Sequence, residues 1–180
     1  QGFNFIATVE AIIDAGAKPV MCNIDQSLNM CPDDLKKLIS KKTKAIIPVH
    51  MLGVTCKMDE IKKIAKKNRI KILEDNCEAM GAKYKNKLLG TLGEMGVVSY
   101  DFGKTITCGE GGMLFTNDKK LDKYARDYHD HGHELNPNFP RGEDTVKIIG
   151  FNYRMTEMQA IIGKEQLKKL DKIIRENKKR

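Results

Sequence analysis

Helical and extended patterns alternate along the first 75 residues of the chain. Apolar residues recur every three or four positions in segments that begin near residues 7, 32 and 58, with charged residues between them, as in amphipathic helices. Short, mainly apolar runs follow these segments and predict buried strands at residues 19–24, 44–49 and 69–73. Because parallel neighbours need crossover connections, this alternation favours a parallel sheet with helices on its faces.

The next part of the chain is richer in turns. Eight of the 15 glycines lie between Gly81 and Gly112. Apolar runs among and after them predict two further strands, at residues 97–100 and 113–115. This segment is therefore expected to complete the sheet through tight turns rather than through further helical crossovers.

Two helices and a long loop are predicted in the last third. A polar cap at residues 116–118 starts one helix, and Thr156 with Gln159 forms a capping-box pattern that starts another, which we expect to continue to Ile174. Between them, residues 129–150 show no periodicity and predict a loop. A loop of this length in a compact domain is commonly functional.

Composition and charge exclude several classes of protein. A chain of 180 residues with 41% hydrophobic content can bury a core, which excludes a mainly disordered protein. The longest nearly apolar stretch, residues 45–56, is too short to span a bilayer, so no membrane association is expected. Residues 164–180 carry eight Lys/Arg and three Asp/Glu, which is +5 of the net +8. These charges flank an apolar helix stripe without aromatic residues for base stacking, so no nucleic-acid binding is expected.

The cysteines and the first residue bear on location and completeness. Five cysteines, with no C-x-x-C pair, suit neither a disulfide framework nor a zinc ribbon, and they predict reduced thiols and a cytoplasmic location. The chain begins with Gln, and its opening segment does not have the pattern of a signal peptide. We therefore expect these residues to be part of a longer protein.

Three polar side chains stand at the ends of predicted strands. His50 follows one strand, Asp75 closes the next, and Ser99 lies at the end of the run that begins at Val97. In open parallel sheets, ligands bind beyond the carboxyl ends of the strands. Each of these groups is therefore a candidate for function, although a polar residue at a strand end is often only a turn or capping device.

Lys104 lies in the most informative segment, residues 99–112. It follows Ser99 by five residues and precedes a Gly109-Glu110-Gly111-Gly112 run, whose exposed backbone can approach an anion. One interpretation is a surface lysine before a glycine hairpin. The other is a Schiff-base lysine, since an amine in a semi-enclosed pocket becomes a better nucleophile towards an aldehyde. The sequence contains no dinucleotide-binding or P-loop glycine motif.

A histidine cluster offers an alternative of a different class. His129, His131 and His133 alternate, and on one face of a strand they could ligate zinc. Pro137 and Pro140 lie close behind, which makes a regular strand doubtful. A zinc-binding interaction module is thus the weaker hypothesis.

Six segments, in order along the chain, match the sequence pattern of one protein family. They are residues 3–8 (FNFIAT), 17–25 (AKPVMCNID), 48–53 (PVHMLG), 74–79 (EDNCEA), 99–112 (SYDFGKTITCGEGG) and 150–163 (GFNYRMTEMQAIIG). With these segments the chain resembles the DegT/StrS family of pyridoxal-phosphate-dependent sugar aminotransferases over essentially its whole length, and the resemblance makes Lys104 the Schiff-base lysine. It implies an α/β fold with a mixed, mainly parallel sheet and flanking helices, like the large domain of fold-type I pyridoxal-phosphate enzymes.

The resemblance also implies roles for individual residues around pyridoxal 5'-phosphate. Asp75 would pair with the ring nitrogen, and Lys104 would hold the cofactor and shuttle a proton. Ser99 would donate to its phosphate, and Phe5 would lie against the ring face. Glu78 stands where the family usually has glutamine or histidine near the ring hydroxyl. Asn152, with Arg154 as a second candidate, matches the segment that reaches the cofactor phosphate of a neighbouring subunit, which implies a homodimer with shared active sites.

The activity implied is transfer of an amino group from an amino acid, commonly glutamate, to a keto sugar for cell-surface polysaccharide or lipopolysaccharide. Lysine rather than histidine at position 104 argues against the dehydratase branch of the family. Residues 1–180 match the central portion of the large domain, without the family's upstream phosphate loop and C-terminal small domain, so the piece is expected to be inactive alone. A catalytically inactive paralogue or regulator that binds the cofactor is the remaining alternative.

Overall fold

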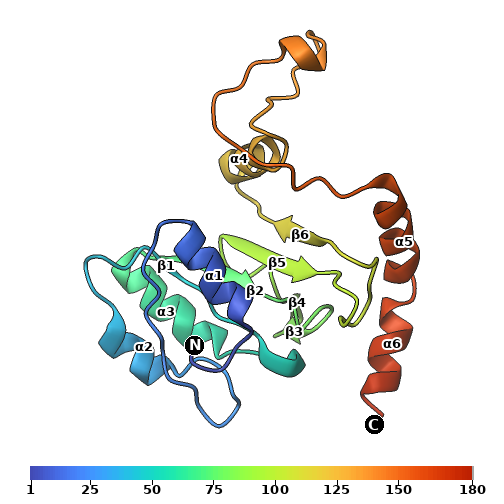
Figure 1. The fold of residues 1–180 in the computed structure, drawn as a ribbon. Coiled ribbons are helices and arrows are strands. Elements are labelled where there is room, and N and C mark those ends of the chain that lie inside the picture. The colour runs from blue at the N-terminus through green and yellow to red at the C-terminus, as the bar shows by residue number, and fades with distance from the viewer. Residues whose placement is uncertain (180) are drawn as a thin grey trace.

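A computed structural model describes residues 1–179 of the chain. Its centre is a four-stranded sheet with strand order β1-β2-β5-β6 (Figure 1). Strands β1, β2 and β5 run parallel to one another, and β6 runs antiparallel to β5, so the expected mixed, mainly parallel sheet with flanking helices is confirmed. The four strands are β1 (Ala45–Ile46), β2 (Lys71–Asp75), β5 (Met95–Ser99) and β6 (Gly112–Phe115).

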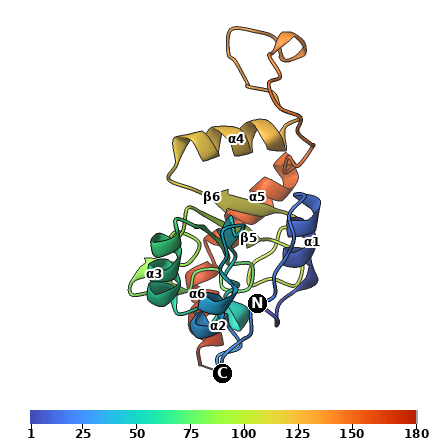
Figure 2. The same ribbon diagram turned by 90° about the vertical axis from the view of Figure 1, so that its left-hand side faces the viewer.

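Helices lie on both sides of this sheet. Figure 2 shows α1 (Ile6–Asp14) on one side and α3 (Met58–Asn68) on the other. The apolar face of α3 packs against β1, β2 and the short helix α2 (Pro32–Leu38). Met58 and Ile61 of α3 are fully buried, and burying such a side chain contributes about 1.5–3 kcal/mol. This cluster is the larger of the two cores, and it fixes the strands that carry the site.

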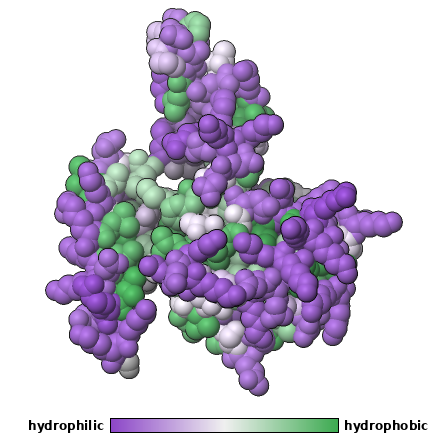
Figure 3. Space-filling view, turned by 180° about the vertical axis from the view of Figure 1, so that it is seen from behind, coloured by the Kyte–Doolittle hydropathy of each residue, from purple (hydrophilic) through white to green (hydrophobic). Residues whose placement is uncertain are grey.

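A second core lies between the β5–β6 pair and the last helix. Val98, Tyr100, Ile106 and Cys108 are buried there, and Leu170 of α6 (Leu170–Asn177) packs against them. The preceding helix α5 (Glu157–Leu167) has the predicted capping box at its start, yet its apolar residues are exposed. Figure 3 shows apolar residues gathered between α5–α6 and the body of the molecule, whereas most of the remaining surface in that view is hydrophilic.

Residues 129–153 form an arm that projects from the sheet (Figure 1). The arm follows α4 (Lys119–His129), whose cap Asp118 accepts from two backbone N–H groups as predicted, and it contains one short helix, η2 (Arg141–Glu143). Buried Asp130 holds the arm together by accepting hydrogen bonds from Arg141 and Arg154. The remaining elements are the turn η1 (Met51–Gly53) and the small hairpin of β3 (Lys83–Tyr84) and β4 (Lys87–Leu88).

Two predicted strands and one helix differ from expectation. Residues 19–24 form no strand among the described residues beyond a single bridge, Ile24 to Met30, and Val20 is 62% exposed. The run 44–49 is a strand only at Ala45–Ile46, because Pro48 has no N–H to extend the ladder. The helix predicted to continue to Ile174 breaks between α5 and α6, which turns Leu170 onto the second core.

Glycine is required where the loop after β4 crosses β5. A Cβ atom added to Gly96 would lie 2.0 Å from the carbonyl oxygen of Gly90. This close approach brings the backbone N–H groups of the loop to the sheet, where the Glu74 carboxylate accepts hydrogen bonds from them. Among residues 1–179, no helix is long and apolar enough to cross a membrane.

Candidate active site at the carboxyl edge of the sheet

The three candidate residues at strand ends, His50, Asp75 and Ser99, lie at one edge of the sheet. Val49 bridges Asp75 in parallel, and the backbone N–H of His50 donates to the Asp75 carbonyl at 3.0 Å. On the other side, Asp75 is in register with Val97, two residues before Ser99. The edge therefore presents the ends of β1, β2 and β5 side by side, as the topology of a parallel sheet requires.

The carboxylate of Asp75 is held at both of its oxygens. The hydroxyl of Thr8 donates to Oδ2 at 2.7 Å, and the backbone N–H of Cys77 donates to Oδ1 at 3.1 Å. A carboxylate oxygen has two acceptor positions, so each oxygen keeps one for a further donor. Asp75 is half-buried, which leaves it reachable from the edge.

Lys104 extends from the loop after β5 towards α1. Its ammonium lies 5.9 Å from the centroid of the Phe5 ring, within cation–π range. Its backbone N–H donates to the Asp101 carbonyl at 3.0 Å, which forms a turn directly after the strand. The structure thus brings together an amine and an aromatic face that lie 99 positions apart in the sequence.

Cys77 lies in the electrostatic field of both charged groups. Burial first, and then the charge of Asp75, raise the pKa of its thiol to about 12, while the Lys104 ammonium acts in the opposite direction. The thiol is therefore protonated at neutral pH and is a poor nucleophile. Of these neighbours, Lys104 is the group with the chemistry to attack a carbonyl.

Ser99 stands at the end of β5 with its hydroxyl proton uncommitted among the described contacts. Its oxygen accepts from the Asp101 N–H at 3.2 Å, and a hydroxyl that accepts one bond still has its own O–H to donate. The strand places this donor at the same edge as Asp75, so an anionic group over the edge could accept from it.

Glu78 lies in the turn after Asp75 and reaches a neighbouring turn. Its Oε2 accepts from the backbone N–H of Leu52 at 3.1 Å. Leu52 has φ of 53° and is 69% exposed. The carboxylate thus ties the turn after β2 to the turn after β1, a contact that the sequence did not suggest.

His50 and Glu74 form a buried layer beneath this edge. The His50 Nε2–H donates to Glu74 Oε2 at 3.2 Å, and its Nδ1 accepts from the Cys56 N–H at 3.1 Å. Both side chains are buried, so His50 supports the site rather than facing a ligand. Burial by itself would raise the pKa of Glu74, but hydrogen bonds from His50 and from three backbone N–H groups outweigh it and lower the pKa. Those three groups belong to Gly93, Gly90 and Leu92.

Asn152 lies in the arm, apart from the strand-end residues. It bridges Asp130, and its side-chain oxygen accepts from the Arg154 N–H at 3.3 Å. Its neighbours Phe151 and Tyr153 are exposed and stack with rings 5.6 Å apart. Arg154, the second candidate, is already paired with Asp130. Asn152 is thus an exposed residue of the arm, and none of its described contacts is with the strand-end residues.

The histidine cluster does not form a metal site in the part of the chain that the structure describes. No group of three or more potential ligands is positioned to hold an ion there. His129 ends α4 and contacts the Arg126 carbonyl, while His131 has φ of 57°. The three imidazoles thus share no strand face, and the zinc-module alternative loses its geometric basis.

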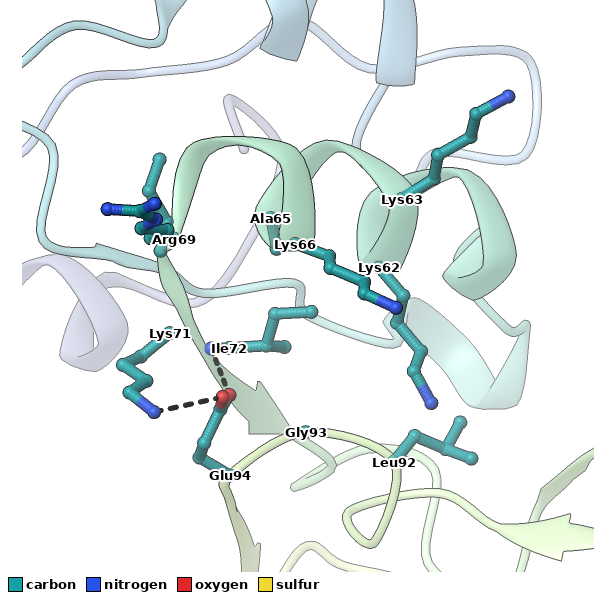
Figure 4. A pocket seen from close by; sticks show the side chains of 11 residues that line it. Lys62, Lys63, Ala65, Lys66, Arg69, Lys71, Ile72, Leu92, Gly93 and Glu94 are labelled. Atoms are coloured by element: carbon teal, nitrogen blue, oxygen red, sulfur yellow. Dashed lines mark hydrogen bonds and ion pairs between the residues drawn. The ribbon is translucent and has the colours of Figure 1, made fainter.

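A groove of about 800 Å³ lies at the opposite end of β2 (Figure 4). Lys62 and Lys66 extend over it from α3, above Ile72. Its one carboxylate, Glu94, already accepts from the Ile72 N–H at 2.7 Å and pairs with Lys71 at 3.4 Å. A lysine-rich helix face of this kind is solvated, and the carboxylate of Glu94 is already paired, so the carboxyl edge is the better candidate for chemistry.

Sequence reasoning assigned no role to Thr8 or Glu74, although both contact the site. Thr8 belongs to the matched segment 3–8, and its position three residues after Phe5 could have indicated that both lie on one helix face. Glu74 also belongs to a matched segment, residues 74–79, but its spacing gives no signal, because the backbone amides that it contacts lie 16 to 19 residues away.

Comparison with known proteins shows a family match over the whole chain. The profile of the DegT/DnrJ/EryC1/StrS aminotransferase family matches residues 1–180. GDP-perosamine synthase from Escherichia coli O157:H7 is 42% identical over 171 residues, which cover 94% of this chain and 46% of that protein.

Two solved structures have the same fold. PseC of Helicobacter pylori, an aminotransferase involved in the biosynthesis of pseudoaminic acid, superposes with a TM-score of 0.88 at 34% identity, over 93% of this chain and 44% of that one. The E. coli GDP-4-keto-6-deoxy-D-mannose-3-dehydratase with bound hydrated PLP gives 0.85 at 34% identity, over 94% and 47%. The chain thus spans about half the length of the relatives it matches.

Proposed function

The chain belongs to the DegT/DnrJ/EryC1/StrS aminotransferase family, and on that premise we propose that its protein is a pyridoxal-phosphate-dependent sugar aminotransferase. It takes an amino group from an amino acid, glutamate first among the candidates, and passes it to a keto sugar used in cell-surface polysaccharide or lipopolysaccharide. The observation that carries this proposal is the position of the Lys104 amine beside the Phe5 ring, at the edge where Asp75 and Ser99 end their strands.

The residues at the edge fit the cofactor by the chemistry of their donors and acceptors. Pyridoxal phosphate, when bound, supplies an electron sink for reactions at the α-carbon of an amino acid. Asp75 has a free acceptor position on each oxygen for the ring nitrogen, and Ser99 has a hydroxyl proton to donate to the phosphate. Phe5 is 64% exposed and offers an open ring face.

Lys104 has two tasks in this proposal. Its amine would hold the cofactor through the aldehyde group, and as a free amine it would move the proton at the substrate α-carbon. Glu78, which holds the turn at Leu52, would stand near the ring hydroxyl. Lysine rather than histidine at position 104 favours amino transfer over the dehydratase chemistry of relatives in the same family.

The arm supports a homodimer with shared sites as part of this proposal. Asn152 would reach the cofactor phosphate of the neighbouring subunit. Two observations support the homodimer. The arm projects from the sheet (Figure 1), and apolar side chains on the arm and on α5 are exposed, among them Ile149, which is 87% exposed, and Met158, which is 76% exposed. A second copy of the protein would cover part of this surface.

Location and extent complete the proposal. The five cysteines are free thiols, which fits a cytoplasmic enzyme. Residues 1–180 are the central portion of a longer cofactor-binding domain, which fits the 46% of GDP-perosamine synthase that they span. The upstream phosphate loop and the C-terminal small domain would lie outside them, and the 180 residues alone do not turn over.

Borohydride reduction of the full-length protein with pyridoxal phosphate, followed by peptide mapping, tests the central assignment. The cofactor label is expected on Lys104, and a label on Lys83 or another lysine would contradict it. Amino transfer from glutamate is then measured with a panel of keto sugars. Label on Lys104 without a single turnover from any amino donor would favour the alternative, an inactive cofactor-binding paralogue or regulator.

A further inference from the structure

The structure assigns Thr8 as a positioning residue for the Asp75 carboxylate, an inference that rests on the proposed function. The Thr8 hydroxyl donates to Asp75 Oδ2 at 2.7 Å across 67 residues of sequence. The Cys77 N–H donates to the other oxygen, Oδ1, at 3.1 Å. One donor on each oxygen fixes the plane of the carboxylate and the direction of its remaining acceptor positions.

Thr8 owes its position to the first turn of α1. The helix begins at Ile6 with Phe5 as its N-cap, so Thr8 is the third helical residue and lies one turn beyond the aromatic ring. Phe5 in turn lies beside Lys104. A single helical turn therefore carries both the ring that would face the cofactor and the hydroxyl that orients Asp75, the residue that would pair with the ring nitrogen.

Because α1 has little packing of its own, this hydrogen bond is an important contact between the helix and the sheet. All of α1 is described, and the helix has no buried residue. The backbone of Thr8 has its own bond to the Phe5 carbonyl at 3.3 Å, so the hydroxyl is not needed to form the turn. Its donation to Asp75 connects the helix to β2 at the position where the chemistry takes place.

Four single variants of the full-length protein separate positioning from helix anchoring. Thr8→Val keeps the shape and Thr8→Ala improves helix propensity, and both remove the hydroxyl, whereas Thr8→Ser keeps it. Thr116→Val is the matched control, because half-buried Thr116 donates a bond of similar length, 2.8 Å, to the Glu94 carbonyl at the other end of the sheet.

Three measurements are made on each variant: the dissociation constant of pyridoxal phosphate, the pH titration of its bound absorption band, and kcat for amino transfer. We expect Thr8→Val and Thr8→Ala to shift the titration and to lower kcat by about tenfold, the loss that follows from removing one hydrogen bond to a charged group. Thr8→Ser and Thr116→Val should keep the wild-type titration and lose little rate.

The outcomes are distinct. Unchanged titration and kcat in Thr8→Ala would overturn the assignment of Thr8, and so would an equal effect in Thr8→Ser. If Thr8→Val lowers the melting temperature too far to be measured, Thr8→Ala gives the answer, because alanine preserves the helix. A wild-type protein that forms no bound absorption band would instead contradict the proposed function itself.

Discussion

The carboxylate of Glu78 accepts a hydrogen bond from the backbone N–H of Leu52 at 3.1 Å, and Leu52 is held in the left-handed region with φ of 53°. A bulky residue in this region costs of order 1 kcal/mol or more and persists only where its surroundings hold it. The bond connects the turns that follow β1 and β2, both of which border the proposed cofactor site. Glu78 therefore has a structural task beside any contact with the cofactor.

Glu78→Gln and Glu78→Ala should differ. The glutamine oxygen can still accept from Leu52, and glutamine is common at this position in the family, so Glu78→Gln should bind pyridoxal phosphate nearly as well as the wild type. Glu78→Ala leaves the strained turn unsupported and should lower the free energy of unfolding by about 1 kcal/mol. Chemical denaturation of both variants measures this difference.

Leu52→Gly is the control for the turn. Glycine adopts the left-handed conformation without the steric cost, so combining Leu52→Gly with Glu78→Ala should recover part of the lost stability. Equal destabilisation by Glu78→Ala in the two backgrounds would show that the carboxylate does not support the turn.

The Glu74 array predicts a specific dependence of stability on pH. Burial opposes ionisation, but bonds from His50, Gly93, Gly90 and Leu92 lower the folded-state pKa of Glu74 below its ordinary value. The stability that it contributes is fully present above the unfolded pKa of glutamate, about 4.3, and is lost as the pH falls through the folded value. Neutral and alkaline pH should leave this contribution unchanged.

Glu74→Gln tests this prediction. The variant should lose about 3 kcal/mol at neutral pH, because the amide replaces a buried charge that accepts four hydrogen bonds. Unfolding free energies are measured from pH 7 down to about pH 3, and the gap between wild type and variant should narrow in acid. Parallel curves over that range would show that Glu74 is not the titrating group.

Local patterns predicted the starts of helices well. Pro32, Asp118 and Thr156 begin helices where the sequence placed them, because caps and first turns depend on residues within three or four positions. The strand-end location of Asp75 and Ser99 was also predictable, because parallel strands end at one edge.

Contacts between distant loops were not predictable in the same way. Thr8 reaches Asp75 across 67 residues, and Glu74 meets amides whose orientation depends on the path of the loop before β5. The strand expected at residues 19–24 failed for a related reason, since an apolar run needs a neighbouring ladder and here Ile24 finds only Met30. Such partners depend on tertiary packing, which periodicity does not encode.

Gly96→Ala should be strongly destabilising. The added methyl would lie 2.0 Å from the Gly90 carbonyl oxygen, so either β5 or the loop above it must move. Overpacking of this kind costs about 3 kcal/mol. The movement also takes the backbone N–H groups of the loop away from Glu74, which accepts hydrogen bonds from them. Thermal unfolding of Gly96→Ala beside the control Gly142→Ala, whose Cβ would meet nothing within 4 Å, measures the effect, and equal melting temperatures would contradict the close approach.

Mixing two inactive variants of the full-length protein tests whether sites are shared between subunits. If Lys104 acts in its own subunit and Asn152 acts in the neighbour's site, a mixed dimer of Lys104→Ala and Asn152→Ala contains one site with both residues intact. Random exchange makes about half of the dimers mixed, so activity should rise to about a quarter of the wild-type value.

The matched control mixes Lys104→Ala with Asp75→Asn, which lie in one site at the carboxyl edge, and every site then keeps one defect. Recovery of activity in the first mixture alone would support a shared site. No recovery in dimers shown to be mixed would mean that Asn152 acts in the site of its own subunit and that the projection of the arm is unrelated to site sharing.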